Sequence, residues 1–416
     1  MTAATTSRVP AEHGGHPALR RLVPVDPQTF AREHWSRRPL VTQAAELPGA
    51  LTDLFDPDAV DELVSRRGLR APFLRVARDG RTLGDREFTQ DGGVGATVAD
   101  QVSDDKLLRL FGQGSTIVLQ GLHRTWGPLI DFTQQLAEEL GHPVQANAYV
   151  TPSQNTGFSD HYDVHDVFVL QMAGEKRWRL RAPVHASPLR DEPWTDHRAA
   201  VEEAGRAEPE LEFTLRPGDV LYLPRGWIHS ATALGGVSTH LTLGVHVWTR
   251  RHLADELVRL ALESASRDER VRASLDLTPS GFDRDLLGAD IDLVRESLVR
   301  ELMSIDSGAV VDALEARVRG AQRPAPIRPL AQVAAAESLT PETGLRLRPH
   351  VDARLVPDPH GSVTLHSRLG ERAVAPHDVG TFVALVGGGV LRADMVGLEL
   401  ARQLMRSGLL VVADET

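Results

Sequence analysis

The sequence predicts a mainly β domain, a sandwich or barrel, followed by a helical region and a small winged-helix-like α+β domain. The first observation is a series of short β-branched and aromatic runs between residues 144 and 248, separated by turn signals such as "RPGD" and "PRG". Short strands at this spacing are typical of all-β folds and not of alternating strand–helix units. The second observation is that strand signals stop after residue 250, where apolar residues recur at helical spacing.

The N-terminal part predicts a tail and a few elements that precede the β region. We expect residues 1–19 to form a flexible tail, because a Gly-Gly pair and a proline interrupt them. In "VDPQTFAREHW" Asp26 has the position of a helix N-cap and Pro27 that of the first helical residue. The run 115–122 predicts a strand, and 127–142 predicts a helix that ends at a glycine.

The β region predicts seven strands within a first domain that spans residues 20–250. The turn signal "AGE" divides two of these strands into a hairpin, and "LGG" divides the last two. We expect strands over 144–150, 161–172, 176–182, 211–215, 219–223, 228–233 and 239–248.

The C-terminal part predicts two further regions. Residues 251–322 contain amphipathic helices, and the proline-rich stretch "QRPAPIRP" marks a boundary after them. Residues 330–416 read as a hairpin, a short helix, and a helix that runs into a strand. This combination of helices with a small hairpin suggests a winged-helix-like domain.

Composition narrows the classes of function. The chain has 416 residues, a net charge of −11 and no cysteine, which excludes disulfides and thiolate metal sites. A negative balance without a basic stripe argues against direct nucleic-acid binding. No run approaches the ~20 apolar residues that a membrane helix needs, and the first residues lack the apolar core of a signal peptide. We therefore expect a cytoplasmic protein without membrane contacts.

A candidate metal site lies in "FSDHYDVHDVFVLQ". On a strand His161 and Asp163 would share one face, and His229 opens a later strand from which it could join them. Two histidines and one carboxylate form the facial triad of non-haem Fe(II) oxygenases. The alternative is a polar strand end that faces water, because an isolated H-x-D pair arises often by chance.

Lys176 follows the "AGE" turn, thirteen residues after Asp163. A buried cation near an iron centre would pair with the distal carboxylate of a 2-oxoglutarate co-substrate. The alternative is an exposed hairpin lysine.

These motifs resemble a known family. "HYDVHDVFVLQMAGEKRWRL" followed by "GDVLYLPRGWIHSATA" is similar to the JmjC/cupin-like 2-oxoglutarate oxygenases, specifically the bacterial and eukaryotic ribosomal oxygenases. "NAYVTPSQNTGFSDHYD" and "STHLTLGVHVW" also resemble that family, over about 24–250 in all. The resemblance implies a double-stranded β-helix (JmjC/cupin barrel), a helical dimerisation region, a winged-helix-like end and a homodimer.

The resemblance also implies roles for individual residues. Where the family often has Ser, this chain has Gly244, which removes a hydroxyl from the closing strand. His165 shares the face of His161 by parity, but a fourth ligand would block the metal, so we expect it to support the ligands or lie at the rim. Asp160 and Asp166 are expected to face solvent or pair with arginine, and Trp178 to lie in the core. The implied set is iron ligands His161, Asp163 and His229; co-substrate residues Lys176, Asn147 and Thr242; and residues that line the substrate pocket or support the ligands, Tyr149, His240 and His165.

The implied activity is an Fe(II)- and 2-oxoglutarate-dependent hydroxylation that uses O2 and releases succinate and CO2. The implied target is an Arg or His side chain of a protein, with a ribosomal protein first, and an acidic enzyme would attract a basic protein. Three alternatives stay open: hydroxylation of a peptide natural product or small molecule, JmjC-type demethylation, and a non-catalytic cupin scaffold.

Overall fold

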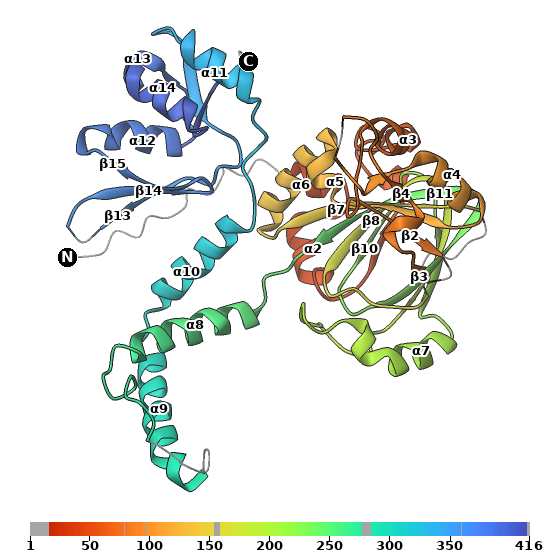
Figure 1. The fold of residues 1–416 in the computed structure, drawn as a ribbon, viewed down its shortest axis with the longest axis horizontal. Helices are drawn as coiled ribbons and strands as arrows, with labels where there is room; N and C mark the ends of the chain where they lie inside the picture. The colour runs from red at the N-terminus through yellow and green to blue at the C-terminus, as the bar shows by residue number, and fades with distance from the viewer. Residues whose placement is uncertain are drawn as a thin grey trace. The chain divides into compact units, whose positions relative to one another are not determined.

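The computed structural model describes residues 16–78, 80–95, 97–153, 159–276, 284–358 and 360–413, so most of the predicted tail lies outside the described residues. The chain divides into two compact units, Met1–Val247 and Trp248–Thr416 (Figure 1). The division falls three residues before the predicted boundary at 250. None of the described helices has the length and apolarity needed to cross a membrane.

A nine-stranded antiparallel sheet builds the N-terminal unit. Its strand order is β1-β10-β8-β11-β7-β6-β2-β3, and β9 pairs with β8. The mainly β prediction for this region is therefore confirmed. The strands are β1 (Leu40–Thr42), β2 (Leu74–Arg78), β3 (Arg81–Thr82), β6 (Thr116–Leu119), β7 (Val144–Thr151), β8 (Asp166–Arg181), β9 (Leu211–Leu215), β10 (Val220–Leu223) and β11 (Ile228–Val245); β4 (Thr89–Gln90) and β5 (Gln101–Val102) pair separately.

Two predicted turns are wrong, because β8 and β11 each run through the place where a turn was expected. The two strands pair antiparallel along their length, from Ile228 opposite Arg181 to Val245 opposite Asp166. The glycines of "AGE" and "LGG" accompany a β-bulge in this ladder instead of a reversal. Gly174 has φ +64°, and a Cβ there would lie 2.2 Å from the carbonyl oxygen of Val237, so only glycine fits the bulge.

Several local predictions for the N-terminal unit are confirmed. α2 (Pro27–Glu33) begins at Asp26, whose side chain accepts from the backbone N–H groups of Gln28 and Thr29. α6 (Gly127–Leu140) ends at Gly141, which has φ +71°. The remaining helices are α1 (Pro17–Arg20), α3 (Pro57–Arg66), α4 (Asp104–Gly112), α5 (Leu122–Thr125) and α7 (Arg198–Arg206), with 3-10 turns η1 (Ala44–Glu46), η2 (Asp85–Glu87) and η3 (Trp194–His197).

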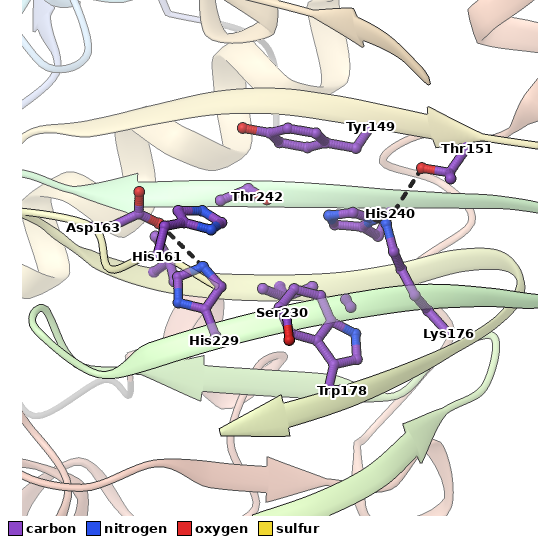
Figure 2. Close-up of a pocket in the computed structure, with 13 residues that line it drawn as sticks. Tyr149, Thr151, His161, Asp163, Lys176, Trp178, His229, Ser230, His240 and Thr242 are labelled. Atoms are coloured by element: carbon purple, nitrogen blue, oxygen red, sulfur yellow. Dashed lines mark hydrogen bonds and ion pairs between the residues drawn. The ribbon is translucent and has the colours of Figure 1, made fainter. Parts of the chain in front are cut away.

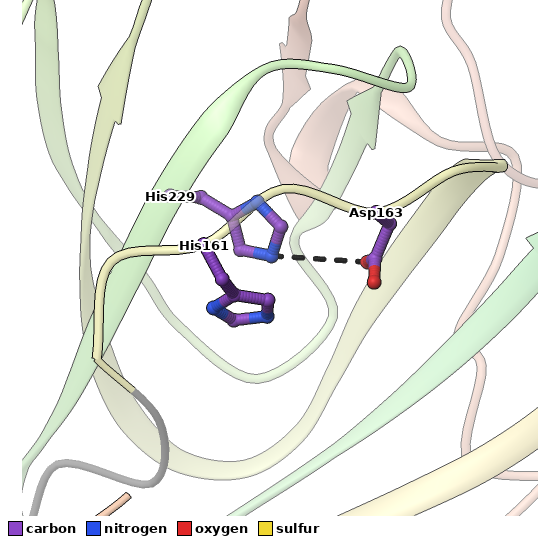
Figure 3. Close-up of side chains that lie close together, drawn as sticks. All are labelled: His161, Asp163 and His229. Carbon is purple, nitrogen blue, oxygen red and sulfur yellow. Dashed lines mark ion pairs between the residues drawn. The ribbon is translucent and has the colours of Figure 1, made fainter. Parts of the chain in front are cut away.

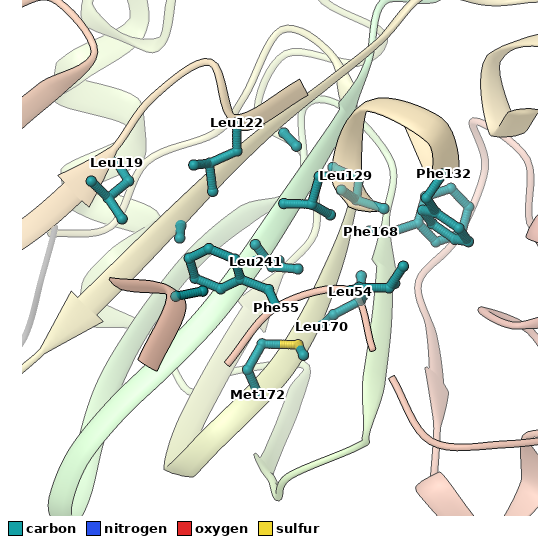
Figure 4. Close-up of a cluster of buried hydrophobic side chains, with 14 of the residues drawn as sticks. Leu54, Phe55, Leu119, Leu122, Leu129, Phe132, Phe168, Leu170, Met172 and Leu241 are labelled. Carbon is teal, nitrogen blue, oxygen red and sulfur yellow. The ribbon is translucent and has the colours of Figure 1, made fainter. Parts of the chain in front are cut away.

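The main core lies between the sheet and the helices. Phe168 and Leu170 of β8 and Leu241 of β11 pack there against Leu129 and Phe132 of α6 (Figure 4). Because side chains alternate along a strand, the residues between these point to the opposite face, which is the inside of the barrel. That face is where the site described below is found.

The C-terminal unit combines the predicted helices with a small α+β part that has its own hydrophobic core. The predicted hairpin is present as β13 and β14, extended by β15. The winged-helix topology stays a prediction. The elements are α8 (Arg250–Ala265), α9 (Arg284–Ser304), α10 (Ser307–Gly320), α11 (Pro329–Glu337), β12 (Gly344–Leu347), β13 (Arg354–Pro357), β14 (Val363–Ser367), β15 (Gly370–Val374), η4 (Pro376–Asp378), α12 (Val379–Val386), β16 (Leu391–Arg392), α13 (Ala393–Val396), α14 (Leu398–Arg406) and β17 (Leu410–Val412).

Candidate metal centre

Three side chains converge at one end of the barrel. His161, Asp163 and His229 each offer a ligand atom, and these atoms all lie within 4.8 Å of one another (Figure 3). Among the described residues this is the only group of three or more His, Cys, Asp or Glu residues with that geometry. The structure therefore brings together the three residues that were predicted from the sequence as metal ligands.

The reason given from the sequence for this convergence is wrong. β8 begins at Asp166, and Asp163 lies before it, outside any strand. His161 and His229 instead form an isolated antiparallel bridge, with N–H to O distances of 3.2 and 2.8 Å. The carbonyl of Asp163 accepts from the N–H of Gly226 at 3.0 Å. Two segments over sixty residues apart in sequence are thus joined through their backbones on both sides of the centre.

Both imidazoles are oriented by backbone carbonyls. The Nδ1 of His161 lies 2.7 Å from the carbonyl oxygen of Ser159, and the Nδ1 of His229 lies 3.0 Å from that of Trp227. A carbonyl oxygen only accepts, so each Nδ1 carries the proton and each Nε2 is the unprotonated ring nitrogen. This is the tautomer that a metal-binding histidine needs.

The protonation states of the group also suit a cation. Burial, together with the neighbouring His161, lowers the pKa of His229 to about 4, so His229 is neutral at neutral pH. Its Nε2 lies 3.8 Å from Oδ2 of Asp163, which is a contact without an ion pair in that state. Burial raises the pKa of Asp163, but the neighbouring His165, His229, His161 and Arg75 together lower it by more, so it lies below its usual value. Two imidazoles and one carboxylate fit Fe(II).

A pocket extends from the three residues into the barrel (Figure 2). At its far end lies Lys176, which is 3% exposed and not the exposed hairpin lysine of the alternative interpretation. Its Nζ contacts the Thr151 hydroxyl at 3.3 Å and Nδ1 of His240 at 3.4 Å. Burial lowers the pKa of Lys176 to about 7. The sequence has only one other lysine, Lys106, so lysine is rare in this chain and yet occupies this buried position.

Three more predicted residues line this pocket: Tyr149, His240 and Thr242. The rings of Tyr149 and His240 stack in parallel with centroids 5.0 Å apart. The sequence interpretation missed Thr151, although it lies two residues after Tyr149 on the same strand and so on the same face. Trp178 lies in a buried hydrophobic cluster, as predicted, and its ring also forms part of the pocket wall, 6.0 Å from the ring of His229.

Two predicted residues do not line the pocket. The Oδ1 of Asn147 accepts from the N–H of Gly121 at 3.1 Å, which ties β7 to the segment before α5. The ring of His165 stacks on His246 with centroids 5.2 Å apart. A Cβ on Gly244 would lie 2.6 Å from Cδ2 of His165, so the glycine leaves room for this ring.

The two other acids of the segment "FSDHYDVHDVFVLQ" that were discussed from the sequence have partners. Asp160 accepts from Nη1 of Arg181 at 2.9 Å, as expected for a pair with arginine. Asp166 is fully buried, where its Oδ2 accepts from the hydroxyl of Tyr222 at 2.5 Å. Its Oδ1 accepts from the N–H of Arg225 at 3.0 Å. Asp166 does not face solvent but pairs with arginine, the other expected outcome, since its Oδ1 lies 3.7 Å from Nη1 of Arg225. These contacts anchor the segment that leads to His229.

Residues 128–253 match the JmjC domain family. The chain is 32% identical over 269 residues to "Ribosomal oxygenase 1" of Gallus gallus, covering 63% of this chain and 42% of that protein. It is 32% identical over 263 residues to "Ribosomal oxygenase 2" of Bos taurus, covering 61% of this chain and 53% of that protein. The chain thus spans about half the length of the curated relatives it matches.

Among solved structures, the Escherichia coli ribosomal oxygenase YcfD matches with a TM-score of 0.54 at 17% identity, over 94% of this chain and 99% of that one. A structure of YcfD in complex with cobalt and 2-oxoglutarate matches with a TM-score of 0.52 at 18% identity, over the same shares of the two chains. At this identity the likeness shows a common fold.

Proposed function

We propose that this chain is a member of the ribosomal oxygenase family and an Fe(II)- and 2-oxoglutarate-dependent dioxygenase that hydroxylates a protein side chain. The match of residues 128–253 to the JmjC domain family and the similarity to ribosomal oxygenases support this proposal. The observation that carries this proposal is a single pocket with a His-Asp-His group at one end and a buried lysine at the other. The triad suits Fe(II), and the lysine suits the second carboxylate of a 2-oxoglutarate co-substrate. A non-catalytic scaffold would need neither.

The roles of the residues follow from their positions. His161 and His229 would present Nε2 and Asp163 a carboxylate oxygen, which leaves half of an octahedral coordination sphere for other ligands. Bound Fe(II) with 2-oxoglutarate supplies the O2 chemistry that protein side chains lack, with succinate and CO2 as co-products. Protonated Lys176 and the Thr151 hydroxyl would hold the far carboxylate. The Tyr149–His240 stack forms the wall between the two ends.

For the substrate we propose a protein, with a ribosomal protein first and Arg or His as the modified residue. The relatives named ribosomal oxygenases support this, and so does the net charge of −11, which favours approach of a basic protein. A demethylase is the second candidate, because a relative of Drosophila persimilis that is 27% identical is named "Bifunctional lysine-specific demethylase and histidyl-hydroxylase NO66". Peptide natural products and small molecules are further candidates for the same chemistry.

The test measures succinate formed from 2-oxoglutarate with Fe(II) and ascorbate, first without substrate and then with ribosomal proteins. Hydroxylation adds one oxygen to a ribosomal protein by intact mass, whereas demethylation releases formaldehyde. Asp163→Ala should abolish succinate formation, and Asp191→Ala, which removes an exposed carboxylate outside the pocket, should not. Equal succinate formation by Asp163→Ala and the unchanged protein would remove the metal assignment.

We also propose a cytoplasmic homodimer. An apolar groove on the helical region supports the dimer, since Ile291, Val294 and Val299 of α9 are 48%, 37% and 54% exposed. Exposed apolar side chains gathered on one helix face suit a protein contact. A monomeric mass by light scattering at micromolar concentration would refute it.

A further inference from the structure

One row of side chains crosses the N-terminal sheet from β2 to β11 and ends in the pocket. Arg75 lies opposite Val118, and Val118 lies opposite Tyr149. Tyr149 in turn lies opposite His240. Residues that face one another on neighbouring strands point to the same face of a sheet. Since Tyr149 and His240 line the pocket, Arg75 points into the barrel as well.

The neighbours of Arg75 on β2 lead to the same conclusion. Leu74 and Val76 are buried members of the main core, on the helix-covered face of the sheet. Side chains alternate along a strand, so Arg75 between them faces the barrel interior. It is half-buried there. A guanidinium remains charged in any protein environment, so this position places a fixed positive charge inside the barrel.

The guanidinium reaches the part of the pocket that holds the metal centre. The Arg75 side chain is hydrogen-bonded to the Tyr149 hydroxyl. That hydroxyl is directed toward the end of the pocket that holds Asp163, whereas Lys176 lies at the other end (Figure 2). Arg75 thus acts on the metal side of the pocket, away from the end that suits the co-substrate.

The metal side of the pocket offers hydrogen-bond donors to a substrate. Both Arg75 and the Tyr149 hydroxyl can donate hydrogen bonds. Asp163 would be neutralised by the metal. Among nearby acids, Asp160 is paired with Arg181. A group with lone pairs would bind well here, whereas a second cation would be repelled.

We propose that Arg75 is a specificity-determining residue, which together with the Tyr149 hydroxyl binds an uncharged, hydrogen-bond-accepting group of the substrate and disfavours a cationic one. This inference rests on the proposed function and narrows its substrate class. An imidazole or amide side chain of a substrate fits the metal side of the pocket. An arginine or a methylated lysine does not.

The test uses two peptide mixtures that are identical except for a central His or Arg, with the complete protein, Fe(II), 2-oxoglutarate and ascorbate. We expect succinate above the peptide-free background, and addition of one oxygen, with the His mixture. Arg75→Gln should raise KM for that mixture by about tenfold or more with a smaller change in kcat. Arg75→Lys keeps the charge but loses the planar fork, so its KM should lie in between.

Arg78→Gln is the matched control. Arg78 lies on the same strand but donates to Ser115 Oγ at 3.0 Å and Gln113 Oε1 at 2.9 Å, outside the pocket. A preference of the unchanged protein for the Arg mixture would overturn the inference. Equal KM values for Arg75→Gln and Arg78→Gln would overturn it as well. If Arg75→Gln does not fold, Arg75→Lys takes its place, and a KM equal to that of Arg78→Gln would overturn the inference. Absence of metal-dependent succinate formation under all conditions would instead refute the proposed function.

Discussion

Replacing Lys176 by Met should remove co-substrate binding and at the same time stabilise the protein. Burial lowers the pKa of Lys176 from 10.5 to about 7. Because a tenfold change in an ionisation constant is equivalent to about 1.4 kcal/mol, the buried lysine costs about 4 kcal/mol of folding free energy at pH 7. Its two contacts, to Thr151 at 3.3 Å and His240 at 3.4 Å, are long. Each returns about 0.5–1.5 kcal/mol. The expected gain for Lys176→Met is therefore about 2–3 kcal/mol at pH 7.

The pH dependence provides the stricter test. Between pH 7 and 10.5 the unfolded chain holds a proton on Lys176 that the folded chain has lost, so the stability of the unchanged protein rises with pH in this range. The gain from Lys176→Met should accordingly shrink by about 3 kcal/mol between pH 7 and pH 9.5. Urea denaturation of the N-terminal unit at both pH values measures this.

Lys106→Met is the control, for which we expect the opposite change in stability. The Nζ of Lys106 donates to the carbonyl oxygens of Thr89 at 2.5 Å and Arg86 at 3.2 Å, so its loss should destabilise the fold. A Lys176→Met protein that is less stable than the unchanged one at pH 7 would refute the reasoning. A stability difference that does not change with pH would refute it too.

Three further predictions concern the same barrel. Co-substrate affinity should fall about tenfold per pH unit above pH 7, because the anion needs protonated Lys176, whose pKa is about 7 in the free pocket; calorimetric titration with 2-oxoglutarate measures this, and a flat profile would contradict it. Gly174→Ala should destabilise by more than about 2 kcal/mol, since its φ is +64° and the new Cβ would meet the Val237 carbonyl oxygen at 2.2 Å; an unchanged urea midpoint would show that the bulge can relax. Gly244→Ala should cost about 1–3 kcal/mol through its clash with His165, and the double variant with His165→Ala should recover part of the loss; additive losses in the double-mutant cycle would exclude this coupling.

The sequence was most informative where short-range chemistry decides structure. Asp26 and Pro27 identified the start of α2, and the glycine after residue 140 identified the end of α6. These signals depend on neighbours within one helical turn. The positions of the strands could also be predicted from the sequence, but their number could not. Whether a glycine in a β run makes a turn or a bulge depends on the partner strand, and the partner of Gly174 lies near Val237.

For the site, the sequence by itself determined the residue types: two histidines and an aspartate, a rare lysine, and no cysteine that could compete. Only the tertiary structure decided how they meet. The backbone bridge between His161 and His229 sets the metal group, and burial makes Lys176 a residue with a pKa of about 7. Arg75 carries no local signal at all, because it reaches Tyr149 across an intervening strand. Such contacts arise from the order in which distant strands pair, which no local pattern of residues encodes.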